Sequence, residues 1–393
     1  MRILHVVPYM HPSAGGPPVV VENFIRETKR LGHLSEIVST PLFCQGDENA
    51  LVQRLNELAP TSFVSPFAIP GLLRGPVRQQ VARSVQNADV VHLHTLWNPI
   101  NVLVRQECRR SLRPYVLMPH GMLDPYSLKV KRLQKSLYFW MVERANIIAA
   151  RRLIYTTPEE ARLVAAQFSS LPRGVVIPLG GDAPFEDSEQ LAREFFARFP
   201  TAQNRRVLLF LGRLHFKKGI DRILRSLPAV ASAIPDVLLL IVGDGEPAYE
   251  AKLKASIQAQ ELEGHVLMTG RLSGRQKWAA YAAARLFLLP SRQENFAITV
   301  AEAMHMGLPV VISDRVNTWP YVEDADAGLV LEEREIDDLG NRVIPLLRDD
   351  SRLASMGARG RDYARRNLTW SGAAIRLLDC YNEILGRVCI RNT

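Results

Sequence analysis

The feature that most constrains the fold is a regular alternation of short β-rich runs with longer helical patterns. The first series of predicted strands covers residues 3–7, 35–39, 89–94, 115–118, 153–156 and 175–179, and the second covers 207–211, 237–242, 266–268, 286–289, 310–312 and 328–331. Parallel strands need a long crossover between them, and that crossover is usually a helix. The alternation therefore predicts α/β architecture in the form of two doubly wound, Rossmann-like domains.

The strand pattern lapses between the two series. Residues 183–204 contain Pro184 and a charged segment, and we predict that they form a linker. We therefore expect a first domain at residues 1–182, a second at 205–368, and a C-terminal helix at 369–393 that returns to the first. A chain of 393 residues is too long for one ordinary core, and a hydrophobic content of 47% can fill two. If the two domains face each other across a cleft, both should contribute the carboxyl ends of their strands to one site.

Several classes of protein are disfavoured by composition. The four cysteines, Cys44, Cys108, Cys380 and Cys389, form no CxxC pair, which argues against zinc and for ordinary reduced thiols. No apolar run approaches the roughly 20 residues needed to span a bilayer. The segment 1–8 is too short to serve as the hydrophobic part of a signal peptide. These features predict a cytoplasmic protein.

The positive charge of the chain is concentrated in one region. Residues 105–152 hold eleven basic and three acidic residues, a net charge of +8 in a chain whose formal charge is +9. Within it, residues 129–141 predict a basic amphipathic helix, with Lys129, Arg132 and Lys135 on one side and Leu133, Leu137 and Trp140 on another. Two interpretations remain open, an ordinary helix with a solvated basic face or a helix that docks on anionic lipid. Nucleic acid is not expected, because no aromatic stacking sheet or known reader motif is present.

Glu294 and Glu302 lie around a predicted strand-to-helix turn. Residues 285–290 indicate a buried strand, and a helix-forming segment begins at Ala297. The amides of such a helix start, near Thr299, form an anion site for which phosphate is the usual ligand. Two carboxylates that flank a phosphate site indicate recognition of hydroxyl groups.

The start of the second series carries a basic turn. The strand at 207–211 is followed by Arg213 and, after a short turn, by Lys218. A guanidinium and an ammonium group at the end of a strand can hold a diphosphate through charge-assisted hydrogen bonds. Taken alone, this turn is also compatible with a solvated basic loop.

Several motifs together resemble one large family, the retaining GT-B glycosyltransferases of the glycosyltransferase 4 type. In chain order they are Gly15-Gly16, Pro119-His120-Gly121, the segment 212–219 (GRLHFKKG), the segment 242–245 (VGDG), and Glu294 with Glu302 eight residues later. The order and spacing follow the family over nearly the whole chain. Each motif alone is weak, and the joint occurrence gives the resemblance its weight.

The resemblance implies a role for each matching residue. Arg213 and Lys218 would bind the nucleotide diphosphate, Glu294 the hydroxyls of the transferred sugar, Glu302 the ribose, and His120 would lie beside the donor sugar. It also implies substrate contacts from Gly15, Gly16, Gly243, Leu272, Asn295, Phe296, Ala297 and Thr299. The glycine pair suits a loop that closes over phosphates or acceptor, since glycine lets backbone amides approach an anion.

The sequence departs from the family where the sugar would bind. The family commonly has Gly-Phe-Gly after the first glutamate, and this chain has Asn295-Phe296-Ala297. Asn295 adds a polar side chain, so the donor preference does not carry over from the family. Ala297 is the milder change and costs only some backbone freedom.

The sequence also contains three weaker metal or acid signals. His92 and His94 share a strand face and resemble a metal pair, but no third ligand is evident, so a structural role is favoured, with His94 a candidate on the acceptor side. The tripeptide from Asp324 to Asp326 resembles the metal-binding motif of a different glycosyltransferase fold, and its place in an acidic turn indicates surface. Asp124 is expected to cap a turn. We predict no metal and no cofactor.

The resemblance implies a hexosyltransferase that moves a sugar from a nucleotide-diphosphate donor to an acceptor hydroxyl, with retention and without a metal. The leaving phosphate is the candidate proton acceptor. The expected setting is polysaccharide or glycolipid assembly at the cytoplasmic face of a membrane, where the enzyme would be a peripheral protein with a sugar or lipid-linked glycan acceptor.

Other functions fit less well. A nucleotide-sugar epimerase would share fold and donor site but need no acceptor, and a non-catalytic partner subunit would be expected to lack Glu294 or Lys218. A dehydrogenase is weaker, because residues 242–245 lack a full GxGxxG. As a glycosidase pair, Glu294 and Glu302 would be about 12 Å apart if both were helical, against roughly 5 to 9.5 Å in such enzymes.

Overall fold

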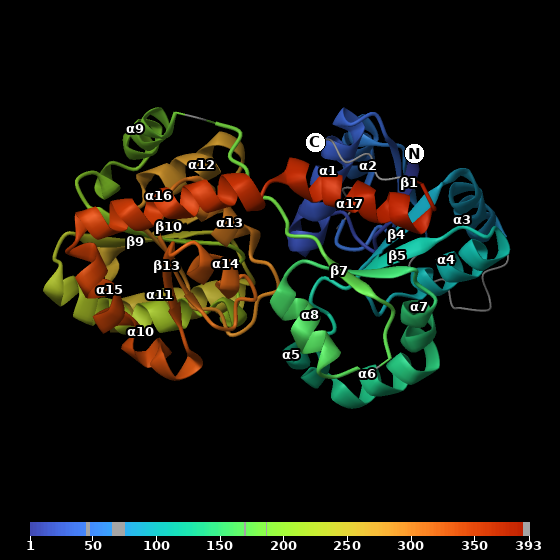
Figure 1. Ribbon diagram of the computed structural model, residues 1–393. Coiled ribbons are helices and arrows are strands. Elements are labelled where there is room, and N and C mark those ends of the chain that lie inside the picture. The colour runs from blue at the N-terminus through green and yellow to red at the C-terminus, as the bar shows by residue number, and fades with distance from the viewer. Residues whose placement is uncertain (45–47, 65–74, 169, 186, 388–393) are drawn as a thin grey trace. The chain divides into compact units, whose positions relative to one another are not determined.

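The computed structural model describes the chain except for residues 45–47, 65–74, 169, 186 and 388–393 (Figure 1). The chain divides into two compact units. The N-terminal unit comprises Met1–Leu179 and Trp370–Thr393, and the C-terminal unit comprises Gly180–Thr369. Both units have the same plan, a parallel sheet with helices on its two faces.

The sheet of the N-terminal unit contains seven strands among the described residues, in the order β3-β2-β1-β4-β5-β6-β7. The strands are β1 (Arg2–Val6), β2 (Leu34–Ser39), β3 (Thr61–Phe63), β4 (Val90–His94), β5 (Tyr115–Met118), β6 (Arg152–Tyr155) and β7 (Gly174–Val176). The helices are α1 (Gly16–Arg30), α2 (Glu48–Leu58), α3 (Pro76–Asn87), α4 (Pro99–Arg110), α5 (Pro125–Lys129), α6 (Arg132–Tyr138), α7 (Arg144–Ile148), α8 (Pro158–Ala165) and α17 (Trp370–Ile384). A π-helical turn, η2 (Phe139–Glu143), joins α6 to α7.

The central strands of this sheet are buried on both faces, as their apolar sequences require. One core cluster includes Leu4, Leu93 and Leu117, and a second, on the other face, includes Val7 and Ile25. The last helix, α17, packs against α1, where the rings of Phe24 and Trp370 meet edge to face with centroids 6.1 Å apart. The end of the described chain is thus part of the N-terminal unit.

The C-terminal unit repeats this architecture with six strands among the described residues, in the order β10-β9-β8-β11-β12-β13. They are β8 (Arg206–Leu211), β9 (Val237–Val242), β10 (Val266–Gly270), β11 (Leu286–Leu289), β12 (Val310–Ser313) and β13 (Gly328–Leu331). The helices are α9 (Ser188–Arg198), α10 (Ile220–Ala233), α11 (Pro247–Ala259), α12 (Gly274–Ala283), α13 (Ile298–His305), α14 (Trp319–Asp324), α15 (Leu339–Leu347) and α16 (Asp350–Asn367). In both units the strand order reverses beside the first strand, which is where such sheets bind ligands.

Each strand predicted from the sequence is present, and the α/β prediction is confirmed. One strand was missed, the edge strand β3, because its three residues are too few to show a periodicity. Among the described residues, no helix combines the length and the apolar character needed to cross a membrane.

The predicted linker at residues 183–204 was wrong in one respect, because it contains helix α9. Asp187 caps this helix by accepting from the amide of Gln190, at 2.8 Å. Leu191 and Phe195, four residues apart and buried, face α12 of the C-terminal unit. Two apolar positions four residues apart indicate a helix, but charged residues surround them in this segment, so the helix was not predicted.

The predicted amphipathic helix at residues 129–141 is also interrupted. α5 ends at Lys129, Val130 is extended, and Lys131 has a left-handed backbone with a φ of 55° before α6 begins. The regular basic spacing gives no sign of this break. The basic and apolar side chains are therefore presented from a bent series of short helices, seen below the sheet in Figure 1.

Candidate active site

The predicted anion-binding turn lies at the carboxyl end of β11. The strand ends at Leu289, and α13 begins at Ile298, directly after Ala297, which has a left-handed backbone with a φ of 51°. Glu294 lies on the intervening loop. Its amide donates to the carbonyl of Arg315 at 2.9 Å, and its carbonyl accepts from the amide of Asn317 at 3.1 Å. The loop after β12 thus fixes the backbone from which Glu294 projects.

Lys218 and Glu294, which are 76 positions apart, form an ion pair between Nζ and Oε1. Lys218 belongs to the turn after β8, the strand that pairs with β11. The two loops approach so closely that a Cβ on Gly219 would lie 2.1 Å from the carbonyl oxygen of Pro290. Gly219 also has a φ of +74°, so only glycine fits this turn without strain. Both side chains of the pair keep partial exposure, 20% for Lys218 and 16% for Glu294.

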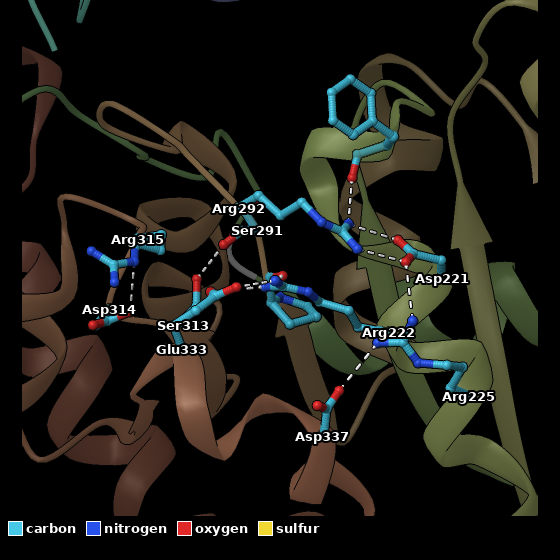
Figure 2. A network of polar contacts seen from close by, with 12 residues as sticks. Asp221, Arg222, Arg225, Ser291, Arg292, Ser313, Asp314, Arg315, Glu333 and Asp337 are labelled. Carbon is cyan, nitrogen blue, oxygen red and sulfur yellow. Dashed lines mark hydrogen bonds and ion pairs between the residues drawn. The ribbon is translucent and has the colours of Figure 1, made fainter. Parts of the chain in front are cut away.

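A network of charged side chains locks the same two loops together (Figure 2). Arg292, on the loop after β11, donates to both carboxylate oxygens of Asp221 on α10, at 2.8 and 2.7 Å, and to the carbonyl of Phe216 at 2.7 Å. Burial opposes ionisation of Asp221, but the adjacent guanidinium outweighs it, and the pKa of Asp221 is lowered. Arg222 pairs with Glu333 and donates to the carbonyl of Pro290 at 3.2 Å. This network was not predicted, because its members carry no recognisable motif.

The turn that carries Arg213 lies against the VGDG turn. A Cβ on Gly243 would lie 1.9 Å from the carbonyl oxygen of Gly212, and the amide of Leu214 donates to the carbonyl of Asp244 at 2.7 Å. Gly243 is thus required by the close approach of the two backbones. Arg213 is exposed and makes no ion pair with another described residue. Its guanidinium is therefore available to an anionic ligand.

The pKa of His215 reflects the positive charge of this turn. Burial lowers the pKa of His215, the cationic groups of Arg213 and Lys217 lower it further, and only Glu246 opposes them among its main influences. A cation is thus disfavoured here and an anion favoured.

Glu302 lies in α13 and is mostly buried, with 8% of its surface exposed. Its carboxylate accepts from Nζ of Lys277 at 2.6 Å and from the hydroxyl of Tyr281 at 2.8 Å, both on α12. Burial and the neighbouring Glu302 raise the pKa of Tyr281 well above its usual range, so the phenol stays a donor. An ionised carboxylate has about four acceptor positions, so these two partners leave room for a further hydroxyl. Sequence reasoning missed Lys277 and Tyr281.

The remaining predicted donor contacts surround α13. Thr299 lies in its first turn, and Leu272 is buried in the loop before α12. Phe296 is 4% exposed and packs against Tyr321 with ring centroids 6.4 Å apart, so it supports the loop from inside. Asn295 is partly exposed beside Glu294.

In the N-terminal unit, the predicted residues occupy two places. Gly15 directly precedes α1 and Gly16 is its first residue, on the segment that follows β1. His94 ends β4, and His120 follows β5 with a left-handed backbone, at a φ of 52°. His94 Nδ1 and His120 Nε2 are 3.1 Å apart, so these two candidates lie together.

His94 and His120 belong to a larger chain of buried imidazoles. His5 Nδ1 lies 3.1 Å from His94 Nε2, and His92 Nδ1 lies 2.7 Å from the hydroxyl of Tyr381 on α17. Burial lowers the pKa of His5 and of His120 to about 3, and lowers those of His92 and His94 well below their usual range. All four rings are therefore neutral at physiological pH.

His5 is the third histidine that sequence reasoning did not find beside His92 and His94. In the sheet, His5 on β1 lies opposite His92 on β4, a register that the sequence does not reveal. One ligand atom from each of the three rings lies within 4.8 Å of the others. However, both nitrogens of His94 already contact imidazoles, and its ring stacks on that of His92 with centroids 3.9 Å apart. This geometry favours a hydrogen-bonded network over ligands that converge on one ion.

Three minor predictions are settled by the structure. Asp124 caps α5 by accepting from the amide of Tyr126 at 2.8 Å, as predicted. Asp324 and Asp326 are exposed, and Asp326 pairs with Arg359 at 2.8 Å, which confirms the surface assignment. Cys108 and Cys380 are buried free thiols and Cys44 is also buried, whereas Cys389 lies outside the described residues.

Comparison with known proteins identifies the class. The model for the glycosyl transferase 4-like domain matches residues 15–180, and that for glycosyl transferases group 1 matches residues 192–363. The GDP-mannose:cellobiosyl-diphosphopolyprenol alpha-mannosyltransferase of Xanthomonas campestris is 27% identical, over 98% of this chain and 98% of its own. The phosphatidyl-myo-inositol mannosyltransferase of Mycolicibacterium smegmatis is 31% identical, over 55% of this chain and 52% of its own.

A solved structure shows the same fold. HepE from Anabaena, in complex with UDP and glucose, matches 98% of this chain and 100% of its own with a TM-score of 0.76 and 20% identity. The fold, the two domain matches and the full-length relative define a glycosyltransferase. The chain belongs to the glycosyltransferase 4 type of the GT-B glycosyltransferases, which confirms the resemblance noted in its motifs.

Proposed function

We propose that this enzyme transfers a mannosyl residue from GDP-mannose to a hydroxyl group of a lipid-linked glycan, with retention at the anomeric carbon. The names of the relatives support both substrates, since they specify a GDP-mannose donor in one case and lipid-linked or lipid acceptors in both. The observation that carries the proposal is the ion pair between Lys218 and Glu294 at the carboxyl ends of β8 and β11. In our proposal the cation of this pair binds phosphate and the carboxylate binds sugar hydroxyls.

Negative charge grows on the diphosphate as the bond to the sugar breaks. In our proposal, Arg213, Lys218 and the amides at the start of α13 are the fixed positive groups directed at that charge. The network of Asp221, Arg222 and Arg292 joins the loop that carries Lys218 to the loop that leads to α13, so the backbones of both are fixed before the reaction. Such preorganised donors typically contribute roughly 10²- to 10³-fold each to the rate.

Glu294 orients the sugar in this scheme and does not attack it. On donor binding, the ammonium group of Lys218 turns to the phosphates, and the carboxylate of Glu294 accepts from hydroxyls of the sugar. Glu302 accepts from the ribose and remains anchored by Lys277 and Tyr281. Asn295, beside Glu294, is our candidate for donor selection, because the family commonly has glycine there.

The acceptor proton goes to the departing diphosphate in our proposal. We assign His120 to the residues that meet the reacting sugar, but burial lowers its pKa to about 3, and so weak a base would not remove a hydroxyl proton efficiently. The leaving phosphate oxygen takes the proton as the acceptor oxygen bonds to the anomeric carbon. The cationic side chains supply the charge stabilisation, so we propose that the transfer needs neither metal nor cofactor.

We further propose that the enzyme works on the cytoplasmic face of a membrane, docked through the basic segment at residues 129–141 of the N-terminal unit. The support is the exposure of large apolar side chains among cations, with Leu133, Leu137 and Met141 exposed by 86%, 64% and 72%. Side chains of this kind can enter the interface of a bilayer while neighbouring cations contact anionic lipid.

Donor and acceptor are tested together. Thermal-shift screening against GDP-, UDP- and ADP-sugars should show the largest stabilisation with GDP-mannose. Incubation with GDP-mannose should then release GDP only when a lipid-linked glycan is supplied, and proton NMR of the product should show retained configuration. Conversion of GDP-mannose to another GDP-sugar, without an acceptor and without release of GDP, would instead indicate an epimerase. An inverted product would overturn retention.

A further inference from the structure

The N-terminal unit contains a large pocket that the donor site does not use. It has a volume of about 620 Å³, within the roughly 300 to 1,000 Å³ typical of ligand sites. α5, α6, η2, α7 and the segment after α8 surround it, in the region of Figure 1 that holds the labels α5 to α8. Its apolar wall is formed mainly by Trp97, Leu128, Phe139, Trp140, Phe168 and Leu171.

The polar part of the pocket lining is cationic. Lys129, Arg132, Lys135 and Arg144 line the pocket, and none of its described lining residues is acidic. Lys129 and Arg132 form no ion pair with any other described residue, and Arg144 lies over the ring of Trp140, 5.5 Å from the centroid. Charges of one sign around an apolar hollow match a ligand that is anionic at one end and hydrocarbon at the other.

The pocket lies beside the acceptor candidates along the chain. Trp97 follows His94 by three positions and Pro125 follows His120 by five, so β4 and β5 lead into both features. A lipid held in the pocket would therefore contact segments that directly follow the strands ending near His94 and His120. A sugar attached to the phosphate of that lipid is the part that must reach the reaction.

We propose that this pocket binds the lipid carrier of the acceptor, with a hydrocarbon chain against the aromatic wall and the carrier phosphate against the lysines and arginines that line the pocket. The assignment rests on the proposed function for its biological meaning, but the binding site itself does not. The ligand class is a long-chain phosphate or diphosphate ester.

The pocket can be separated from simple adhesion to a membrane. Leu133, Leu137 and Met141 are exposed apolar side chains that do not line the pocket, whereas Trp140, which is also exposed, does line it. Ser136, on the same helix as Leu133, does line it. A tryptophan at position 136 should fill the pocket without removing any exposed apolar side chain. Gln134 is exposed on α6 and lies outside the pocket, so Gln134→Trp is the matched control.

Binding is tested first without any sugar transfer. Calorimetry below the micelle concentration should detect dodecyl phosphate binding to the wild-type chain and to Gln134→Trp, and at least tenfold weaker binding to Ser136→Trp. Inorganic phosphate and neutral dodecyl maltoside should each bind much more weakly than dodecyl phosphate, because each lacks one end of the ligand. Arg132→Glu should weaken the binding of dodecyl phosphate more than Arg109→Glu does. Arg109→Glu reverses a charge at an exposed position on α4 outside the pocket.

Transfer assays then connect the site to the acceptor. Each methylene moved from water to an apolar site improves binding roughly fourfold. With the wild type, a glycan linked to polyprenyl diphosphate should therefore have a KM at least tenfold below that of the same glycan on methyl diphosphate. Ser136→Trp should remove this difference. Gln134→Trp should keep both the difference and the kcat of the wild type.

The outcomes separate the proposals. Equal binding of dodecyl phosphate by wild type and Ser136→Trp would overturn the pocket assignment, even if the enzyme transfers mannose. Binding that is lost in Ser136→Trp without any transfer to either acceptor would sustain the pocket and overturn the proposed function. If Leu133→Ser with Leu137→Ser abolishes binding to anionic vesicles and also removes the KM difference, adhesion explains the chain preference and the pocket assignment is wrong.

Discussion

The ammonium group of Lys218 pairs with the carboxylate of Glu294, although the two residues belong to turns after different strands. Each residue is thus held by the other in a position where ligand groups can replace it. In the proposed function, a diphosphate replaces Glu294 as the partner of Lys218, and sugar hydroxyls replace Lys218 as the partners of Glu294. The ion pair changes the free energy of folding little, because both side chains retain contact with solvent.

Removal of either charge should affect catalysis more than folding. Lys218→Ala and Glu294→Ala are expected to lower kcat/KM by roughly 10²- to 10³-fold, because a fixed contact to the transition state is lost. The melting temperature should change little, since a partly exposed pair contributes only about 0 to 1 kcal/mol. Lys254→Ala, at an exposed position of α11, is the control. Wild-type transfer rates in both variants would overturn the site assignment.

Gly219 should be intolerant of a side chain. Gly219→Ala would place a Cβ 2.1 Å from the carbonyl oxygen of Pro290, at a residue with a φ of +74°. The clash and strain should destabilise the fold by roughly 1 to 3 kcal/mol and move Lys218. Urea unfolding measures the first effect, and GDP-mannose affinity the second. Gly264→Ala, where nothing lies within 4 Å of the new Cβ, should leave both unchanged.

The contact between Asp221 and Arg292 should stabilise the protein in a pH-dependent way. The pKa of Asp221 is lowered in the folded state, so the unfolded state binds a proton more readily. Its contribution is present above the unfolded pKa, near about 3.9, and is lost as pH falls through the folded pKa. The stability difference between wild type and Asp221→Asn should therefore shrink below about pH 4. Asp362→Asn, at an exposed site, should show no such convergence.

The buried histidines should make the stability of the fold sensitive to acid over a higher pH range than Asp221 does. Burial lowers the pKa of His5 to about 3, whereas an unfolded histidine titrates near about 6.5. The unfolded state alone takes up this proton between the two values, so stability falls as pH falls below about 6.5. At pH 5 one such group costs about 2 kcal/mol.

Denaturant unfolding between about pH 7.5 and pH 5 measures this effect. His5→Gln should lose less stability over the interval than the wild type, because it has one fewer proton to take up on unfolding. His11→Gln, at a partly exposed position, serves as the control. Equal losses in wild type and His5→Gln would show that His5 is not a buried neutral imidazole.

The sequence predicted the architecture because parallel strands and crossover helices have different periods, and its motifs indicated the candidate site residues. It did not predict the contacts among them. Lys277 and Tyr281 reach Glu302 from a helix without any motif, and His5 reaches His94 through a strand register. The break at Lys131 depends on one left-handed residue. Each of these features arises from tertiary packing, to which local periodicity is insensitive.

The pH dependence of transfer should show that His120 is not the base. Burial lowers the pKa of His120 to about 3, so its ring is neutral across the range in which the enzyme is folded and active. A catalytic base with an ordinary histidine pKa would give a limb of kcat/KM near about pH 6.5. We expect no such limb between about pH 5.5 and pH 8, once rates are corrected for the folded fraction.

His120→Asn provides the test of that interpretation. Asparagine keeps a polar side chain but cannot titrate, so the variant should be slower by a constant factor and have the same pH profile as the wild type. His11→Gln should match the wild type in both rate and profile. A limb near about pH 6.5 in the wild type that disappears in His120→Asn would instead assign proton removal to His120 and not to the leaving phosphate.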